Sequence, residues 1–271
     1  IRLGGPGGVE VDEAAIKAAQ PFPAAPERTL VLGWNQGRAR LLDELDNYVG
    51  PGSSATVVDE SATAEASVQR VAAGLANQAV NFQVGDTADR HFLETLDLGA
   101  YDHVIVLSDS DTLNPQQADA HTLVTLLHLR DLQERGGFHF SVVTEMLDLR
   151  NRQLAAVTRA DDFIVSDHLV SLLLAQLSEN PGLAEVFEDL FNAEGAEIYL
   201  RPAEAYVEVG RPVTFYTIVE AAARRGETAI GYRQIAGGHS HAERYGVRLN
   251  PLKSRTVTLQ AGDRIVVLAE D

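Results

Sequence analysis

The fold of this chain is decided by the stretch Tyr101-Asp102-His103-Val104-Ile105-Val106-Leu107-Ser108-Asp109. Its centre, residues 104–107, is an unbroken apolar run, without the polar alternation of a strand that is buried on one face only. Such a run is typical of a parallel strand that is covered on both faces, and Ser108-Asp109 marks the edge at which it stops. The stretch therefore predicts a central strand of a parallel sheet.

The same pattern recurs on both sides of this strand. Short apolar runs that end in Gly, Asp or Glu alternate with stretches in which apolar residues recur three and four positions apart, the spacing of a helix. We expect strands at residues 29–32, 55–58, 80–84, 101–107, 138–143 and 163–165. Because strands that alternate with helices form parallel sheets, the sequence predicts an α/β fold with a Rossmann-like, doubly wound parallel sheet.

The pattern changes after the sixth expected strand. Residues 169–177 predict an apolar helix, Asn180-Pro181-Gly182 ends it, and residues 183–191 predict a crossover helix. Beyond Gly195 the sequence predicts a small α+β C-terminal lobe with a helix at residues 214–225. Its strands are expected at residues 197–200, 206–209, 229–232, 257–259 and 264–268.

These changes divide the chain into four expected segments. Residues 1–28, rich in Gly, Pro and Ala, are expected to form a linker or tether. Residues 29–178 form the Rossmann-like N-terminal lobe, residues 179–200 the crossover region, and residues 201–271 the C-terminal lobe. The chain starts with Ile1 in place of Met, so we expect it to be an excised piece of a longer protein.

The composition excludes several classes of function. The 271 residues carry a formal net charge of −17, and residues 201–271 hold 10 Lys or Arg but 8 Asp or Glu, so residues 1–200 carry the whole deficit. This acidity argues against a nucleic-acid partner, which would need a basic face, and favours cations. With no Cys, a disulfide framework and a Cys nucleophile are excluded. No apolar run reaches the ~20 residues of a membrane span, so the chain itself is expected to be soluble.

The first strand is followed by a degenerate glycine loop, Gly33-Trp34-Asn35-Gln36-Gly37-Arg38. A dinucleotide-binding fold places G-x-G-x-x-G here, with an acidic residue after the second strand for the ribose. Asp59 and Glu60 stand at that second position, but Asn35 replaces the second glycine and Arg38 the third. The loop therefore disfavours NAD or another nucleotide. An unused crevice and an anion held by Arg38 remain as alternatives.

Acidic residues stand at the ends of the expected strands, where the edges of a doubly wound sheet meet in one crevice. They are Asp59, Glu60, Asp86, Asp109 and Asp111. Carboxylates that gather there could coordinate a hard cation such as Ca²⁺, and we take Asp86, Asp109 and Asp111 as the candidate metal ligands. The alternative is a set of solvated acidic loops without an ion.

Hydrolytic chemistry has little support in the sequence. There is no G-x-S-x-G, no H-E-x-x-H and no phosphate-binding P-loop. His239 and His241 fall in a Gly-rich loop without a third ligand, and His121 and His128 on the long helix after Pro115 are expected to be surface or packing residues. No catalytic residue is predicted, and the chain is not expected to be an enzyme.

The crossover helix carries a broad apolar stripe with helical spacing. It consists of Leu183, Val186, Phe187, Leu190 and Phe191. The stripe fits two arrangements: packing against its own lobe, or contact with another subunit. We treat these residues as the candidate assembly surface.

Several segments in collinear order resemble RCK domains, the regulators of K⁺ conductance that are also called TrkA-N domains. The stretches Val84-Gly85-Asp86-Thr87 and 101–107 resemble their third and fourth strands, and 261–268 resembles the closing strand of their C-terminal lobe. A closer resemblance is to the CASTOR/POLLUX family of ion channels. It is carried by Gly33-Trp34 and by residues 45–53, 122–131, 145–148, 187–195 and 229–233.

The resemblance implies a gating module on the cytoplasmic side of a membrane. RCK lobes assemble as a dimer or tetramer into a ring below a pore, and ligand-driven motion of the ring pulls on the linkers to the pore helices. The channels that this chain resembles carry K⁺ or Ca²⁺, and regulation by Ca²⁺ agrees with the acidic first lobe. A nucleotide-binding sensor on the same fold and a purely structural ring element remain as alternatives.

Overall fold

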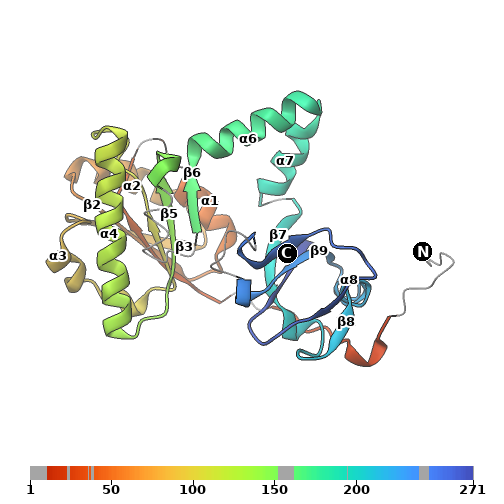
Figure 1. Cartoon of the computed structure of the whole chain (residues 1–271). Coiled ribbons are helices and arrows are strands. Elements are labelled where there is room, and N and C mark those ends of the chain that lie inside the picture. Colours follow the sequence, from red (N-terminus) through yellow and green to blue (C-terminus); the bar gives the residue numbers. More distant parts are fainter. Residues whose placement is uncertain are drawn as a thin grey trace. The chain divides into compact units, whose positions relative to one another are not determined.

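The computed structural model describes residues 11–22, 25–35, 37, 40–151, 162–193, 195–237 and 244–270. The chain divides into two compact units. The α/β unit spans Pro23–Pro181, and the C-terminal unit combines Gly182–Asp271 with the first residues of the chain, up to Phe22. Figure 1 labels the helices and strands of both units.

The α/β unit is built on a six-stranded parallel sheet with the order β3-β2-β1-β4-β5-β6. The strands are β1 (Arg28–Leu32), β2 (Ser53–Asp59), β3 (Gln78–Val84), β4 (His103–Val106), β5 (Ser141–Met146) and β6 (Asp162–Val165). This is the doubly wound order that the alternating pattern predicts. It puts β4, the strand with the unbroken apolar run, beside β1 at the centre of the sheet.

Helices cover both faces of this sheet. They are α1 (Leu41–Tyr48), α2 (Ala62–Ala72), α3 (Arg90–Thr95) and α4 (Pro115–Gly136), with α6 (Ser166–Glu179) after β6. Successive residues of β1 point to opposite faces: Leu30 and Leu32 are buried with Leu126 of α4, and Val31 is buried with Leu42 of α1. The fully apolar central strands follow from this burial on both sides.

Local signals set the ends of these helices. The side chain of Ser61 accepts a hydrogen bond from the Thr63 amide at the start of α2, and Asn114 caps α4 before Pro115. At the end of α4, Gly137 adopts the left-handed conformation, with φ of 65°. The helix start and stop residues visible in the sequence therefore act as capping residues.

The C-terminal unit contains the crossover helix predicted over residues 183–191 and a small α+β fold. Its helices are α7 (Leu183–Phe191) and α8 (Phe215–Ala223). One sheet has the order β10-β9-β12-β7, and β8 pairs with β11. The strands are β7 (Glu197–Pro202), β8 (Pro212–Thr214), β9 (Thr228–Arg233), β10 (Val247–Leu249), β11 (Thr256–Thr258) and β12 (Arg264–Ala269).

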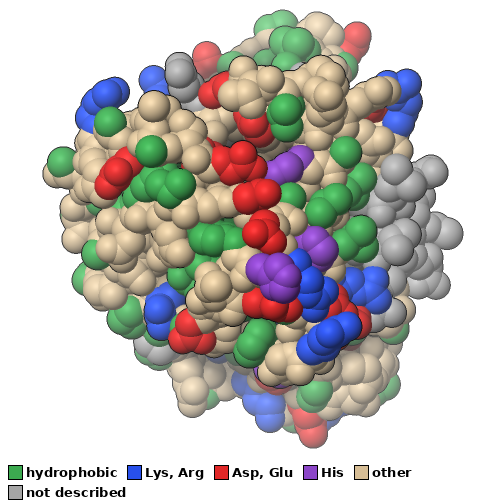
Figure 2. Space-filling view, turned by 90° about the vertical axis from the view of Figure 1, so that its left-hand side faces the viewer, with side chains coloured by type: hydrophobic (Ala, Val, Ile, Leu, Met, Phe, Trp, Pro, Cys, Tyr) green, Lys and Arg blue, Asp and Glu red, His purple; other side chains and the backbone are tan. Residues whose placement is uncertain are grey.

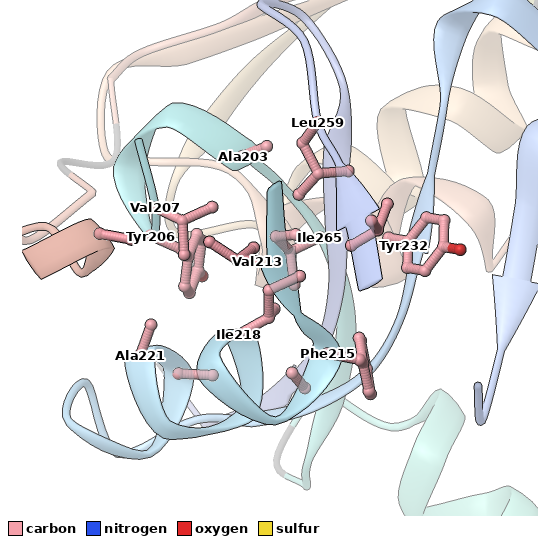
Figure 3. Close-up of a cluster of buried hydrophobic side chains, with 14 of the residues drawn as sticks. Ala203, Tyr206, Val207, Val213, Phe215, Ile218, Ala221, Tyr232, Leu259 and Ile265 are labelled. Carbon is pink, nitrogen blue, oxygen red and sulfur yellow. The ribbon is translucent and has the colours of Figure 1, made fainter. Parts of the chain in front are cut away.

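The core of the C-terminal unit lies between α8 and the strands (Figure 3). Tyr206, Phe215, Ile218 and Ile265 are fully buried there. Residues 206–209, predicted as a strand, instead follow a short 3-10 helix, Ala203–Ala205, and Val207 forms one antiparallel bridge with Ile16. The prediction was wrong because the backbone partner of this segment comes from the start of the chain, far away in sequence.

Part of the expected linker is a folded piece of the C-terminal unit. Ala15 is buried, and the amide of Glu208 donates to its carbonyl at 2.8 Å. Asp12 and Glu13 pair with Arg211 and Arg224 at 2.7 and 2.8 Å. The described residues 11–22 therefore differ from the linker expected over residues 1–28, because apolar and charged side chains in this Pro- and Ala-rich stretch find partners across the C-terminal unit.

Candidate functional site

The loop after β1 starts at Gly33, which has φ of 88°. A Cβ at this position would lie 2.8 Å from the carbonyl oxygen of Leu107, so the backbones of the β1 and β4 ends approach each other more closely than any side chain allows. The first glycine of the predicted loop thus has its expected structural role. It brings the next residues to the carboxyl edge of the sheet.

Asp59, at the end of β2, is hydrogen-bonded to the backbone of this loop. Its carboxylate oxygens accept hydrogen bonds from the amide of Trp34 at 2.9 Å and from the amide of Ser61 at 2.8 Å. Asn35 is buried and donates from Nδ2 to the carbonyl of Ser108 at 2.9 Å. In a dinucleotide site the corresponding acid binds ribose and the second glycine approaches the phosphates; here both positions are engaged within the protein.

A cavity of about 510 Å³ opens at this edge of the α/β unit. It is lined by Gly33, Trp34, Asn35, Asp59, Glu60, Ser61, Thr63, Ala64, Ser67, Thr87, Leu107, Asp109, Asp111, Thr112, Leu113 and His121. These residues bring four carboxylates together, and no Lys or Arg is among the described residues that line it. Gly37 is exposed and is not one of the lining residues, and Arg38 lies outside the described residues.

The carboxylates in this cavity repel one another. Partial burial raises the pKa of Asp59, and the charges of Asp109 and Asp111 raise it further, while its hydrogen bonds from Ser61 and Trp34 act in the opposite direction. Negative charge gathered in this way attracts a cation and opposes a phosphate group.

The candidate metal ligands do not form the set that the sequence predicts. Among the described residues, the ligand atoms that converge within 4.8 Å of one another belong to Glu60, Asp86 and His121. Asp109 accepts hydrogen bonds from the amide and hydroxyl of Thr112, and it lines the cavity together with Asp111. The structure thus places Asp86 with Glu60 and His121, whereas Asp109 and Asp111 line the cavity.

His121 was not among the site residues predicted from the sequence. It was expected to be a surface or packing residue; it is half-buried in the second turn of α4, and its Nε2 is 3.6 Å from Oε1 of Glu60 and 3.5 Å from Oδ1 of Asp86. The signal that could have found it is its distance from Asn114, the N-cap of α4. The first turns of a helix that follows a parallel strand lie at the carboxyl edge of the sheet.

Acidic and histidine side chains also lie next to one another near the middle of the face shown in Figure 2. Of the other histidines considered above, His128 is half-buried on α4, and His239 and His241 lie outside the described residues.

The candidate assembly residues are divided by their exposure. Leu183, Phe187 and Leu190 are half-buried, whereas Val186 is 49% exposed and Phe191 is 59% exposed. The rings of Phe187 and Phe191 stack with centroids 6.2 Å apart. The stripe therefore packs in part on its own unit and leaves two large apolar side chains at the surface.

A parallel α/β unit followed by an antiparallel C-terminal unit is also found in a solved gating ring. Among solved structures, the human SLO3 gating ring matches over 90% of this chain and 44% of that chain, with a TM-score of 0.59 and 12% sequence identity. This similarity establishes the fold.

In sequence the chain is related to the ion channels CASTOR, POLLUX and DMI1. It is 29% identical to CASTOR of Lotus japonicus, in an alignment that covers 78% of this chain and 29% of the relative. It is also 29% identical to the probable ion channel POLLUX of Arabidopsis thaliana, with 96% of this chain and 35% of the relative covered. DMI1 of Medicago truncatula is 29% identical, with 83% of this chain and 29% of the relative covered.

The chain thus spans about a third of the length of these relatives, which are ion channels and not enzymes. No family model matches it. Within the described part of the chain, every helix is too short or too polar to cross a membrane.

Proposed function

We propose that this chain is the regulatory domain of a CASTOR/POLLUX-type cation channel, on the cytoplasmic side of a membrane, and that it senses a divalent cation such as Ca²⁺. The observation that carries the proposal is the cavity at the carboxyl edge of the sheet, which is lined by the carboxylates of Asp59, Glu60, Asp109 and Asp111. Clustered carboxylate oxygens are the ligands that Ca²⁺ prefers.

Sensing requires that the ion binds two arrangements of the domain with different affinity. Bound in the cavity, Ca²⁺ would screen the repulsion that raises the pKa of Asp59. It would also bring together the end of β2 and the loop after β4, which carry Asp59 and Asp109. In a ring of such domains, a change of this kind is transmitted to the pore through the segment that connects the two.

The proposal includes assembly with other RCK domains through α7. Val186 and Phe191 expose apolar surface on a helix whose other apolar residues are half-buried. Exposure of apolar side chains to water is unfavourable, and contact with a second subunit would bury Val186 and Phe191.

Calorimetry with Ca²⁺ at physiological salt tests the sensing function. Saturable binding that weakens at least severalfold in Asp109→Asn is expected, because the substitution removes a cavity charge while keeping an oxygen that accepts from Thr112. The matched control is Asp43→Asn, an equal change of charge at an exposed position of α1 away from the cavity.

A nucleotide sensor is the second candidate, and the observation in its favour is the left-handed Gly33 at the first position of the loop. The hydrogen bonds that occupy Asp59 and Asn35 count against it. A thermal-shift series with NAD, NADH, ATP and ADP separates the two candidates: unchanged melting temperatures are expected, and a concentration-dependent rise with any of them would favour the nucleotide.

A further inference from the structure

Three potential metal ligands meet at one point of the α/β unit although they are far apart in sequence. Glu60 follows β2, Asp86 follows the neighbouring strand β3, and His121 lies on α4. The pairing of Asp59 with Val84 brings the first two to the same edge of the sheet, and α4 supplies the imidazole. The convergence therefore depends on the folded sheet and not on a local turn.

The distances within this group fit the spacing of ligand atoms around a metal ion. The Nε2 atom of His121 lies 3.6 Å from Oε1 of Glu60 and 3.5 Å from Oδ1 of Asp86. Charge-assisted hydrogen bonds measure about 2.7–2.9 Å, so both contacts are too long for a strong one. Ligand atoms about 2.0–2.2 Å from a tetrahedral zinc ion are about 3.4 Å apart, which is close to both measured distances.

The formal charges of the three side chains also favour a cation. One imidazole does not balance two carboxylates. Asp86 is already oriented, because its Oδ1 accepts from the amide of Ala88 at 2.7 Å, and such hydrogen bonds hold a ligating carboxylate in place.

We propose that Glu60, Asp86 and His121 bind a divalent transition-metal ion such as Zn²⁺. An imidazole nitrogen with two carboxylate oxygens suits Zn²⁺ and its neighbours in the first transition row, whereas Ca²⁺ takes six to eight oxygen ligands. Glu60 and Asp86 are exposed, so the fourth position is open to water. The inference extends the proposed cation sensing to a second class of ion at the same edge of the sheet.

Zinc calorimetry of the metal-free chain tests the site, with His121→Asn as the decisive variant. Zn²⁺ is expected to bind with one ion per chain, and its affinity is expected to fall at least tenfold in His121→Asn, Glu60→Gln and Asp86→Asn. His128→Asn, seven residues further along the same helix, is the matched control and should bind Zn²⁺ like the parent chain.

A second measurement keeps the outcome clear if a variant folds poorly. Co²⁺ bound with a nitrogen and two carboxylates at an open tetrahedral site gives strong visible absorption, which is expected in the parent chain and in His128→Asn but not in His121→Asn. Equal binding of Zn²⁺ and equal spectra in the two histidine variants would overturn the inference. Ca²⁺ binding without any Zn²⁺ binding would also overturn the inference while leaving the proposed function intact. Zn²⁺ binding without any Ca²⁺ binding would support the inference and contradict the proposed sensing of Ca²⁺.

Discussion

At the residue scale, Gly33 shows how a single position determines the shape of the cavity. It combines φ of 88° with a space of only 2.8 Å between a potential Cβ and the carbonyl oxygen of Leu107. Gly137 has a similar φ of 65°, but no atom lies within 4 Å of the corresponding Cβ position. Substitutions at the two glycines therefore distinguish the cost of backbone strain from the cost of the close contact at Gly33.

Gly33→Ala is expected to lower the free energy of unfolding by about 3 kcal/mol, because the left-handed backbone and the clash both count against a side chain. Gly137→Ala is expected to cost about 1 kcal/mol, for the backbone alone. Urea unfolding of the three proteins measures the difference. Equal losses in the two variants would show that the β1 and β4 ends do not approach as closely as described.

Tyr206 is a second residue whose environment predicts a measurable effect. It is fully buried, and its hydroxyl donates to the carboxylate of Glu227. Burial, together with this hydrogen bond, raises the pKa of Tyr206 well above its usual range. The tyrosine then stays neutral in the folded chain at a pH where it ionises in the unfolded one, so its contribution to stability is complete below pH ~10 and falls as the pH rises further.

Tyr206→Phe should therefore be less stable than the parent chain at pH 9, and the gap between the two should narrow at pH 11. Urea unfolding at both values measures it, and using the difference between the two proteins cancels the titration of the other tyrosines. A gap that is the same at both values would mean that Tyr206 does not have a raised pKa.

Individual residues also show how far a candidate site can be predicted from sequence. Gly33 and Asp59 were found because a parallel strand order fixes where strands end. His121 was missed, and Asp86 was grouped with Asp109 and Asp111, because these relations depend on the register of β2 on β3 and on the rotation of α4 about its axis. The spacing of residues along the chain predicts neither this register nor this rotation.

At the element scale, the segment of residues 11–22 acts as a part of the C-terminal unit. Phe22 lies against the guanidinium groups of Arg201 and Arg225, at 4.5 and 5.2 Å from its ring centroid, and stacks on Tyr206. These contacts tie the segment to the C-terminal unit. Sequence could not show this, because low periodicity and several prolines look the same in a linker and in a segment that packs along a surface.

Phe22→Ala is expected to lower the free energy of unfolding of the C-terminal unit by about 2 kcal/mol, through lost cation–π and ring contacts. Leu252→Ala in the same unit is the control: its side chain is 78% exposed, and the expected change stays within about 0.5 kcal/mol. Thermal and urea unfolding compare the two. A similar small loss in both would show that residues 11–22 do not hold the unit together.

The helix α7 makes a prediction about assembly. If Val186 and Phe191 are buried between subunits, Val186→Glu and Phe191→Glu should shift the chain toward monomers, because each places a charge in an apolar contact. Glu185→Gln, an exposed position on the same helix, should leave assembly unchanged. Light scattering after size-exclusion chromatography gives the mass, and an unchanged mass in both glutamate variants would contradict assembly through α7.

At the scale of the whole molecule, the charge is concentrated where the proposal needs it. The deficit in residues 1–200 includes the carboxylates at the ends of β2, β3 and β4. The sheet could be predicted from sequence because each strand and helix carries its own periodic signal. The strands β8 and β10 could not, since three residues each are too few to show a periodic pattern.

The most direct test of the central claim, that this cavity senses a divalent cation, is a calorimetric titration of the chain with Ca²⁺ at physiological salt. Saturable binding is predicted for the parent chain and for Asp43→Asn, with an affinity at least severalfold lower in Asp109→Asn. Binding that is absent from the parent chain, or that is equal in Asp109→Asn and Asp43→Asn, would contradict the account.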